Sequence, residues 1–379
     1  MKSKKSKKFI PVFDPEIGKE ELKNVTLALK SKEISGSFGS FLPKFEDEFA
    51  KYCQCQYGIA VNSGTSALDI AVMALGLKSG DEVLVSTFTN MATFFAVLRS
   101  GAKAIGIDVE SDTLNIDPKL IESKITPKTK AIVIVHIYGH PCDMDPIMAI
   151  VKKHNLYLIE DCAEAHGALY KGKKIGSFGD LACFSFYANK VITTGEGGMI
   201  TTNNPQLAEK CRSLRSLAFG KKNKFMHEDI GFGMRLTNLQ AGIGLAQLKK
   251  IEKIIAKKKA IAKYYSSQLK NIKGIQLPVQ KEYARNIYWM YCILVNEEFG
   301  ISRDKLSEEL FKKGIETRFA FVPFNQQEIF IKKGLTKEND CPIANNAGAR
   351  GLYLPSSTLL SKKDMDYVIS AIKEIKAEI

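Results

Sequence analysis

The stretch Lys130–Tyr138, KAIVIVHIY, is almost continuously apolar. A strand with one exposed face alternates apolar and polar residues, so an unbroken apolar run indicates a strand that is covered on both faces. Strands of this kind occur in parallel sheets that have helices on either side. This run therefore favours an α/β protein built on a buried sheet.

Short strand-like runs continue on both sides of this stretch, from about Tyr57 to Thr202. Helix-like segments separate them, and two of these segments, TSALDIAVMALG and NMATFFAVLRSG, end at glycines, as helices often do. Alternating strands and helices predict a mostly parallel sheet in an α/β layer architecture. The expected strands are YGIAVN, DEVLVST, KAIGIDV, KAIVIVHIY, LYLIED, ACFSFY and GMITT.

The pattern changes in the second half of the chain. A long, lysine-rich helical pattern runs from about Leu236 to Leu269, and a strand-like run at 288–295 and a final helix from about Ser361 follow it. We predict a basic N-terminal tail at residues 1–15, a large α/β domain at residues 16–250 and a smaller C-terminal α+β domain at residues 251–379.

The composition excludes several classes of protein. Hydrophobic residues make up 45% of the chain and charged residues 25%, as in ordinary globular proteins. No apolar run is long enough to span a membrane, and the basic N-terminus lacks the apolar core of a secretory signal. We expect a cytoplasmic protein whose eight cysteines are reduced. Neither the cysteines nor the five histidines have the spacing of a metal site, so no metal is expected.

The net charge of +14 raises the question of a nucleic-acid partner. The lysines, however, are spread through amphipathic helices, and no nucleic-acid-binding motif is present. We therefore expect no nucleic-acid partner, and the charge favours an anionic small-molecule substrate instead.

Polar residues that could bind a ligand follow three of the expected strands. Ligands of open parallel sheets lie beyond the carboxyl ends of the strands. Ser63, Gly64 and Thr65 open a helix, where backbone N–H groups bind phosphate, although ordinary capping explains them equally well. Glu160 and Asp161 end LYLIED, and these carboxylates could hold a cation or a protonated heterocyclic nitrogen, or cap the next helix. Lys190 follows ACFSFY, and a desolvated lysine becomes a nucleophile for a carbonyl, whereas most lysines are solvated.

These signals together indicate more than each one alone. A phosphate cradle, a strand-end carboxylate and a lysine with apolar neighbours, in that order on a parallel sheet, are what pyridoxal 5'-phosphate needs. The phosphate would bind at the helix start, the carboxylate would pair with the pyridine N–H⁺, and the lysine would form a Schiff base and carry protons.

Four longer motifs carry a resemblance to a known family. They are SGTSAL, EDCAEAHGA, GSFGDLACFSFYANKVITTGEGGMI and GFGMRLTNLQAGIGLAQL. Together they resemble the DegT/DnrJ/EryC1/StrS family of nucleotide-sugar aminotransferases, and the resemblance covers nearly the whole chain. It implies the aspartate-aminotransferase fold, known as fold type I, with pyridoxal 5'-phosphate as the cofactor.

The resemblance also implies roles for individual residues. Lys190 matches the Schiff-base lysine, Asp161 the partner of the pyridine nitrogen, and Glu164 a residue near the ring hydroxyl of the cofactor. Gly64, Thr65 and Ser185 match phosphate-binding positions, beside Ser63. Asn238 matches an asparagine that reaches the cofactor phosphate of the neighbouring subunit, which implies a homodimer with shared active sites.

The chain departs from the family at positions that face the cofactor or substrate. The element TFTN carries Asn90 where an aromatic ring often stacks on the cofactor, so Phe88 or another residue must cover that ring, or its face is more open. FVPFNQ has Asn325 where a histidine is frequent, and KSKEISGSFG has Glu33 near a frequent tryptophan position. Arg235 and Arg318 are candidate contacts for a substrate pyrophosphate, and Asn90 and Asn325 for the sugar.

The resemblance implies transfer of an amino group from glutamate to a nucleotide-linked 4-keto-6-deoxy sugar, with GDP-4-keto-6-deoxymannose as the first choice. Other keto-sugar nucleotides, UDP- or dTDP-linked and aminated at C3 or C4, stay open. A pyridoxal-phosphate-dependent sugar dehydratase is an alternative, but family members of that kind carry histidine at the position of Lys190. A non-catalytic sensory or binding protein with the same fold is the third possibility, and it would not need the full set of cofactor residues.

Overall fold

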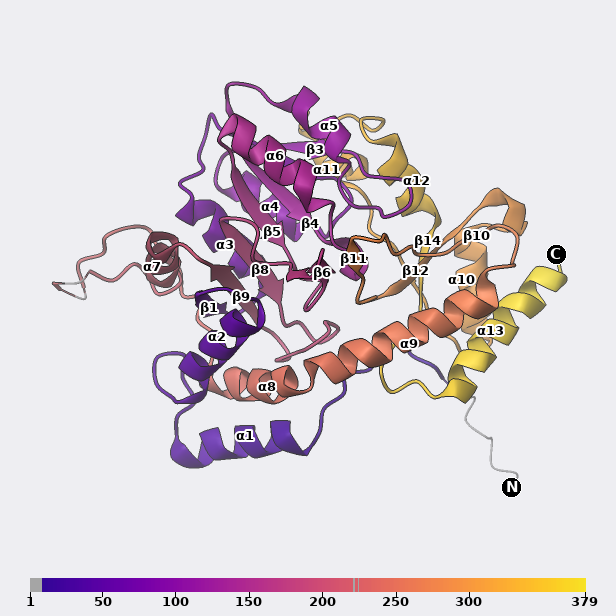
Figure 1. Cartoon of the computed structure of the whole chain (residues 1–379), viewed down its shortest axis with the longest axis horizontal. Helices are drawn as coiled ribbons and strands as arrows, with labels where there is room; N and C mark the ends of the chain where they lie inside the picture. Colours follow the sequence, from indigo (N-terminus) through magenta and orange to yellow (C-terminus); the bar gives the residue numbers. More distant parts are fainter. Residues whose placement is uncertain (1–8, 221, 224) are drawn as a thin grey trace.

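A seven-stranded sheet forms the centre of the protein (Figure 1). The computed structural model describes residues 9–220, 222–223 and 225–379, so the first eight residues of the expected tail lie outside the described residues. In order across the sheet, the strands are β1 (Tyr57–Val61), β9 (Gly198–Thr202), β8 (Leu181–Ser185), β5 (Tyr157–Asp161), β4 (Thr129–Val135), β2 (Glu82–Ser86) and β3 (Lys103–Ile107).

The sheet is mostly parallel. Strands β8, β5, β4, β2 and β3 pair in parallel, whereas β9 runs antiparallel to both of its neighbours, β1 and β8. The predicted α/β architecture with a mostly parallel sheet is therefore confirmed. The carboxyl ends of the parallel strands all meet at one edge of the sheet, which is where ligands bind in folds of this kind.

Helices cover both faces of this sheet and bury β4 almost completely. One core layer packs α3 (Gly64–Ala74), α4 (Ala92–Arg99) and α7 (Pro205–Leu214) on the sheet. The opposite face carries α2 (Phe41–Tyr52), α5 (Pro118–Ile121), α6 (Met144–His154) and α8 (Asn238–Lys249). The double cover explains why the sequence of β4 is apolar throughout and does not alternate.

The C-terminal part contains a four-stranded antiparallel sheet. Three helices pack on one face of it and form a separate core: α9 (Ile251–Leu269), α10 (Arg303–Lys312) and α13 (Lys362–Ala377). The strands, in order, are β10 (Ile275–Gln276), β12 (Tyr291–Val295), β14 (Gly351–Leu354) and β13 (Arg318–Phe319), and two further helices are α11 (Glu328–Lys332) and α12 (Pro342–Arg350).

A strand pairing and a pair of consecutive helices are among the connections between this part and the rest of the chain. Strand β11 (Ala284–Arg285) pairs with β6 (Leu169–Tyr170), which pairs in turn with β7 (Lys173–Lys174). The long helical pattern of the sequence forms two consecutive helices, α8 and α9, which meet at Lys250 (Figure 1). The domain boundary that we propose, between residues 250 and 251, falls at this junction.

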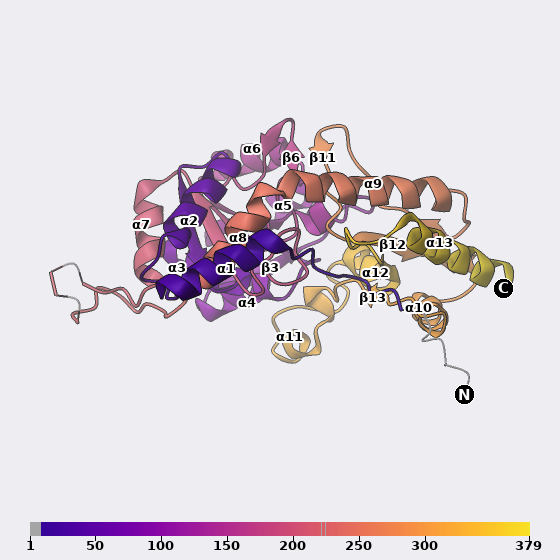
Figure 2. The same cartoon turned by 90° about the horizontal axis from the view of Figure 1, so that it is seen from below.

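The N-terminal segment runs alongside the C-terminal part. Ile10 pairs with Ile315, and the backbone N–H of Val12 donates to the carboxylate of Glu316 (2.9 Å). Helix α1 (Lys19–Ser31) then lies against α8, on the underside of the molecule that Figure 2 shows. The chain therefore passes the C-terminal part before it enters the large sheet.

Candidate active site

A cavity of ≈ 380 Å³ lies at the carboxyl edge of the large sheet, between that sheet and the C-terminal part. Its volume is in the range of small-molecule sites. Nine of the thirteen site residues expected from the sequence line it: Ser63, Gly64, Thr65, Asn90, Asp161, Glu164, Ser185, Lys190 and Arg318.

The start of helix α3 supplies backbone N–H groups to this cavity. Ser63 caps the helix with its hydroxyl oxygen, which accepts from the N–H of Ser66 (3.0 Å). The first N–H groups of a helix have no partner within the helix and attract anions. A Cβ atom on Gly64 would lie 2.7 Å from the Cβ of Ser185, so only glycine leaves the two segments this close. The arrangement is a narrow cradle for an anion such as phosphate.

Asp161, the last residue of β5, presents a buried carboxylate to the cavity. The hydroxyl of Thr93 donates to one carboxylate oxygen (2.8 Å) and the N–H of Ala163 to the other (3.1 Å). Burial raises the pKa of Asp161 although these two bonds oppose the shift. A buried carboxylate held from two sides is prepared to pair with a cation.

Lys190 carries the amine at the centre of the cavity. Its side chain is 11% exposed, and its neighbours Val191 and Ile192 are buried. Burial lowers the pKa of Lys190, whereas the carboxylates of Glu164 and Asp161 raise it. The lowered pKa increases the fraction of free amine, which is the nucleophilic form.

Glu164 is the closest carboxylate to this amine. Its Oε1 lies 4.0 Å from Nζ of Lys190, and its Oε2 accepts from the backbone N–H of Tyr138 (2.9 Å). Burial raises the pKa of Glu164 to about 7, against the opposing charge of Lys190. Glu164 can therefore gain or lose a proton close to neutral pH.

Four expected site residues do not line the cavity. Phe88 is fully buried, packs edge-on against Tyr138 and Phe321 and does not line the cavity, which favours the two alternatives that another residue covers a bound ring or that its face is more open. Asn325 is also fully buried, and its amide nitrogen donates to the carbonyl of Glu338 (2.6 Å) and to Asn345 (2.8 Å). These bonds hold Asn325 away from the cavity, and its assignment to the sugar stays a prediction.

Asn238 and Arg235 lie outside the cavity of their own chain. The side-chain oxygen of Asn238 accepts from the N–H groups of Phe41 and Leu42 (2.9 and 3.0 Å), and its nitrogen donates to Glu33 (2.6 Å). A bond from Asn238 to a phosphate in a neighbouring subunit would have to displace these contacts. The roles of Asn238 and Arg235 stay predictions.

Sequence reasoning missed several residues that shape the cavity. Trp289, Phe321 and Tyr353 come from the C-terminal part and form an aromatic wall. Tyr138 adopts a left-handed backbone conformation (φ 52°), which directs its N–H to Glu164. Trp289, Phe321 and Tyr353 lie far from the motifs in sequence, and the one local signal for them was the aromatic character of the run at 288–295.

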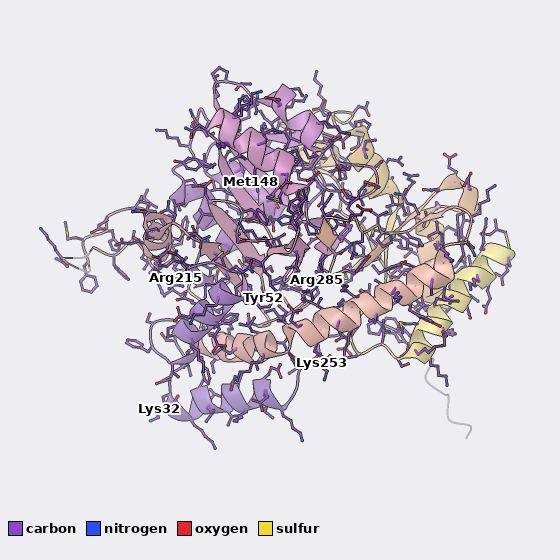
Figure 3. All side chains as sticks on the ribbon, in the orientation of Figure 1. Lys32, Tyr52, Met148, Arg215, Lys253 and Arg285 are labelled. Carbon is purple, nitrogen blue, oxygen red and sulfur yellow. The ribbon has the colours of Figure 1, made fainter. Side chains whose placement is uncertain are left out.

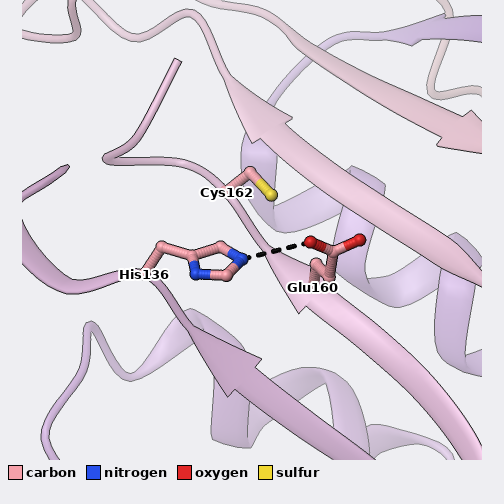
Figure 4. Close-up of side chains that lie close together, drawn as sticks. All are labelled: His136, Glu160 and Cys162. Atoms are coloured by element: carbon pink, nitrogen blue, oxygen red, sulfur yellow. Dashed lines mark hydrogen bonds and ion pairs between the residues drawn. The ribbon is translucent and has the colours of Figure 1, made fainter. Parts of the chain in front are cut away.

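His136, Glu160 and Cys162 form a buried cluster with metal-binding side chains (Figure 4). The Nδ1 of His136 accepts from the N–H of Cys142 (3.0 Å), so its Nε2 carries the hydrogen and donates to Glu160 (3.2 Å). Glu160 also accepts three backbone N–H groups, each at 2.8 Å. Burial raises the pKa of Glu160, but the bonds from His136 and the backbone outweigh it and lower that pKa. The lone pairs that a metal needs are in use, so the cluster serves the packing of the sheet.

The described residues contain no helix that is long and apolar enough to cross a membrane.

Comparisons with known proteins point to one family. A sequence model of the DegT/DnrJ/EryC1/StrS aminotransferase family matches residues 15–373. The chain is 40% identical to GDP-perosamine synthase of Escherichia coli O157:H7, over 98% of this chain and 100% of that protein. It is also 40% identical to GDP-perosamine synthase of Caulobacter vibrioides, over 97% of this chain and 98% of that protein.

Solved structures give the same result. An aminotransferase from Psychrobacter cryohalolentis is 34% identical, with a TM-score of 0.91 over 98% of this chain and 100% of that chain. The PLP form of the putative sugar aminotransferase Spr1654 from Streptococcus pneumoniae is 27% identical, with a TM-score of 0.90 over 98% of both chains.

Proposed function

The chain belongs to the DegT/DnrJ/EryC1/StrS aminotransferase family, and from this premise we propose that it aminates a nucleotide-linked 4-keto-6-deoxy sugar with glutamate as the amino donor. GDP-4-keto-6-deoxymannose is the proposed acceptor and GDP-perosamine the product. Support for this choice comes from relatives named GDP-perosamine synthase that are 40% identical over almost their whole length.

Pyridoxal 5'-phosphate is the proposed cofactor, because the residues at the cavity fit its groups. The N–H groups at the start of α3 and the hydroxyl of Ser185 suit the phosphate, and the carboxylate of Asp161 suits a protonated ring nitrogen. When bound, the cofactor supplies an electron sink for the bond changes at the amino carbon. The observation that carries the proposal is the buried Lys190 amine in one cavity with Asp161 and the α3 cradle.

The side chains of the protein have separate tasks in this proposal. Lys190 would supply a free amine as nucleophile and would then take up the proton from the amino carbon of the substrate, since it is the base at the centre of the cavity. Asp161 holds a positive charge in place, with its orientation fixed by Thr93 and Ala163. Glu164, with a pKa of about 7, holds or releases a proton beside Lys190.

Arg318 is the proposed contact for the substrate diphosphate. In the antiparallel pairing of β13 with β14, Arg318 lies opposite Tyr353, and opposed residues point to the same face of a sheet. Tyr353 lines the cavity, so Arg318 also points to the cavity side, where 54% of its side chain is exposed. Arginine suits a diphosphate because its guanidinium binds two oxygens at once.

A homodimer with shared active sites is proposed as the working unit. Helix α1 buries few of its residues against α8 and leaves Leu22, Leu27 and Leu29 exposed. The following segment adds Ile34 and Phe38, the latter 75% exposed. Several large apolar side chains exposed within one short segment are typical of an interface.

A product assay tests the function. Purified protein is mixed with pyridoxal 5'-phosphate, glutamate and GDP-4-keto-6-deoxymannose, and the products are identified by mass spectrometry. We expect an amino-sugar nucleotide from the wild type and none from Lys190→Ala, while the exposed-lysine variant Lys253→Ala keeps the activity. Turnover by Lys190→Ala at the wild-type rate would overturn the role of this lysine.

The same assay distinguishes the substrates. A dTDP-linked keto sugar is the second candidate, because the chain is 34% identical to dTDP-3-amino-3,4,6-trideoxy-alpha-D-glucose transaminase of Streptomyces venezuelae. Conversion of the cofactor by glutamate without amination of the GDP sugar, together with amination of the dTDP sugar, would select this second candidate.

A further inference from the structure

Trp289 is the only tryptophan of the chain, and it lies directly beside the Lys190 amine. Nζ of Lys190 is 3.9 Å from the centroid of the indole ring. A cation over an aromatic face is attracted by the ring, most strongly by tryptophan and in the absence of water. Trp289 is 3% exposed, so this contact lies in a buried part of the cavity wall.

Trp289 is held at three points. Its indole N–H donates to the carbonyl of Asn189 (2.7 Å), the residue before Lys190, and its backbone N–H donates to the carbonyl of Tyr138 (2.9 Å). Its backbone carbonyl accepts from Nζ of Lys258 (2.8 Å). The ring therefore has one position relative to Lys190, and that position depends on contacts from both parts of the chain.

Lys258 is unusual for a lysine. It lies on α9, is 3% exposed, and donates its second bond to the carbonyl of Ser356 (2.7 Å). Within the described part of the chain, both bonds go to backbone carbonyls and neither goes to a carboxylate. Burial lowers the pKa of Lys258 to about 7. Burying a lysine ammonium without a carboxylate partner costs free energy. The two bonds of Lys258 join α9 to the segment before β12 and to the segment after β14.

We propose that the indole face of Trp289 is the resting place of the Lys190 amine in its protonated form while it is not bonded to the cofactor, and that Lys258 is a positioning residue that fixes this face by binding the Trp289 carbonyl. The amine of Lys190 must be free of the cofactor during part of each transamination, so the inference rests on the proposed function. While free, the amine needs a defined place from which it reaches the substrate carbon. The Trp289 ring supplies that place without a second permanent charge.

The single tryptophan provides a readout that does not depend on activity. In the cofactor-free full chain, an ammonium over the ring quenches the excited indole by proton transfer, so Lys190→Met should raise the emission intensity. Lys258→Met should loosen the ring, shift its emission to longer wavelength and increase its quenching by acrylamide. Lys253→Met, an exposed lysine on the same helix (Figure 3), is the matched control and should change neither.

Kinetics give the second readout. Lys258→Met should slow the conversion of bound cofactor by glutamate about tenfold and change the glutamate concentration for half-maximal rate less than about twofold, since the amine is misplaced and the substrate contacts stay. If Lys258→Met fails to fold, the rates of Trp289→Phe and Trp289→Leu are compared instead to test the proposal. The phenylalanine variant keeps an aromatic face and should be about tenfold faster than the leucine variant.

Two results would overturn the proposal. One is unchanged tryptophan emission in both Lys190→Met and Lys258→Met, and the other is equal rates for Trp289→Phe and Trp289→Leu. Absence of an amino-sugar product, with the emission changes present, would refute the proposed substrate and leave the positions of Trp289 and Lys258 standing.

Discussion

Lys190 shows how far a single residue can be interpreted from its neighbours in sequence. The apolar residues that follow it indicated a buried amine, and the structure gives its side chain 11% exposure and a lowered pKa, caused by burial. The raised pKa of Glu164 could not be predicted from its sequence neighbours, because its value of about 7 comes from the depth of the cavity and the distance to Lys190. Both are tertiary properties.

Glu164 predicts a pH dependence of stability in the cofactor-free protein. Its pKa is raised from 4.5 to about 7, so it stabilises the fold below pH 4.5 and this contribution is lost as the pH rises through 7. Relative to Glu164→Gln, the wild type should lose about 3 kcal/mol of unfolding free energy between pH 4.5 and 8. Urea unfolding of both proteins at the two pH values measures it, and a pH-independent difference would contradict it.

The close approach of Gly64 to Ser185 predicts that a larger residue at position 64 weakens binding of the cofactor phosphate. In Gly64→Ala the new Cβ would lie 2.7 Å from the Cβ of Ser185, so the two segments must separate. The affinity for pyridoxal 5'-phosphate should fall at least about tenfold, since the N–H groups lose their close approach to the phosphate. Titration of the cofactor-free protein by absorbance measures it. Gly233→Ala is the control, because a Cβ there meets open space, and equal losses in both variants would refute the cradle.

Phe88 and Asn325 mark the limit of prediction at this scale. Both were chosen because they stand beside family motifs. Phe88, however, lies in the loop after β2, and Asn325 lies in a short 3-10 helix, so the packing of distant segments decides whether each side chain faces the cavity or the core. Thr89 and Asn90 line the cavity, while Phe88 lies in the core.

At the scale of elements, the sequence predicted which segments form strands better than it predicted the residues at which those strands begin and end. The stretch Lys130–Tyr138 forms β4, which ends at Val135, because Tyr138 turns into a left-handed conformation. The run at 288–295 forms β12, which begins at Tyr291, because Trp289 bonds to Tyr138 and leaves the sheet. At both shortened ends the chain leaves the sheet so that Tyr138 contacts Glu164 and Trp289 lines the cavity. The apolar pattern of the sequence alone does not predict this.

Helix α2 depends on a residue that is distant in sequence. Its own N-cap, Ser40, makes no side-chain capping bond, whereas Asn238 accepts from the first two N–H groups of the helix. Asn238→Ala should therefore lower the unfolding free energy by about 1–3 kcal/mol. Asn238→Asp keeps the acceptor and should cost less than Asn238→Ala. Urea unfolding compares them, and equal losses would show that the cap is not the stabilising contact.

At the scale of the whole molecule, the exposed surface of α1 predicts the oligomeric state. Light scattering should give twice the chain mass of 42.1 kDa. Leu22→Asp with Leu29→Asp should produce monomers without transaminase activity, because charges at an apolar interface prevent association. Phe311→Asp, at a residue of α10 that is 64% exposed, is the control and should leave the dimer intact. Active monomers would contradict shared active sites.

The N-terminal segment packs against residues that are synthesised much later, so it cannot reach its final position early in translation. Val12 binds Glu316, which is 304 residues further along, and its carbonyl accepts from Ser356. A ribosome adds about 5–20 residues per second, so the segment around Val12 has to wait roughly 15–60 s for its partners. Although it is made early, this segment is thus among the last of the described parts to reach its final place.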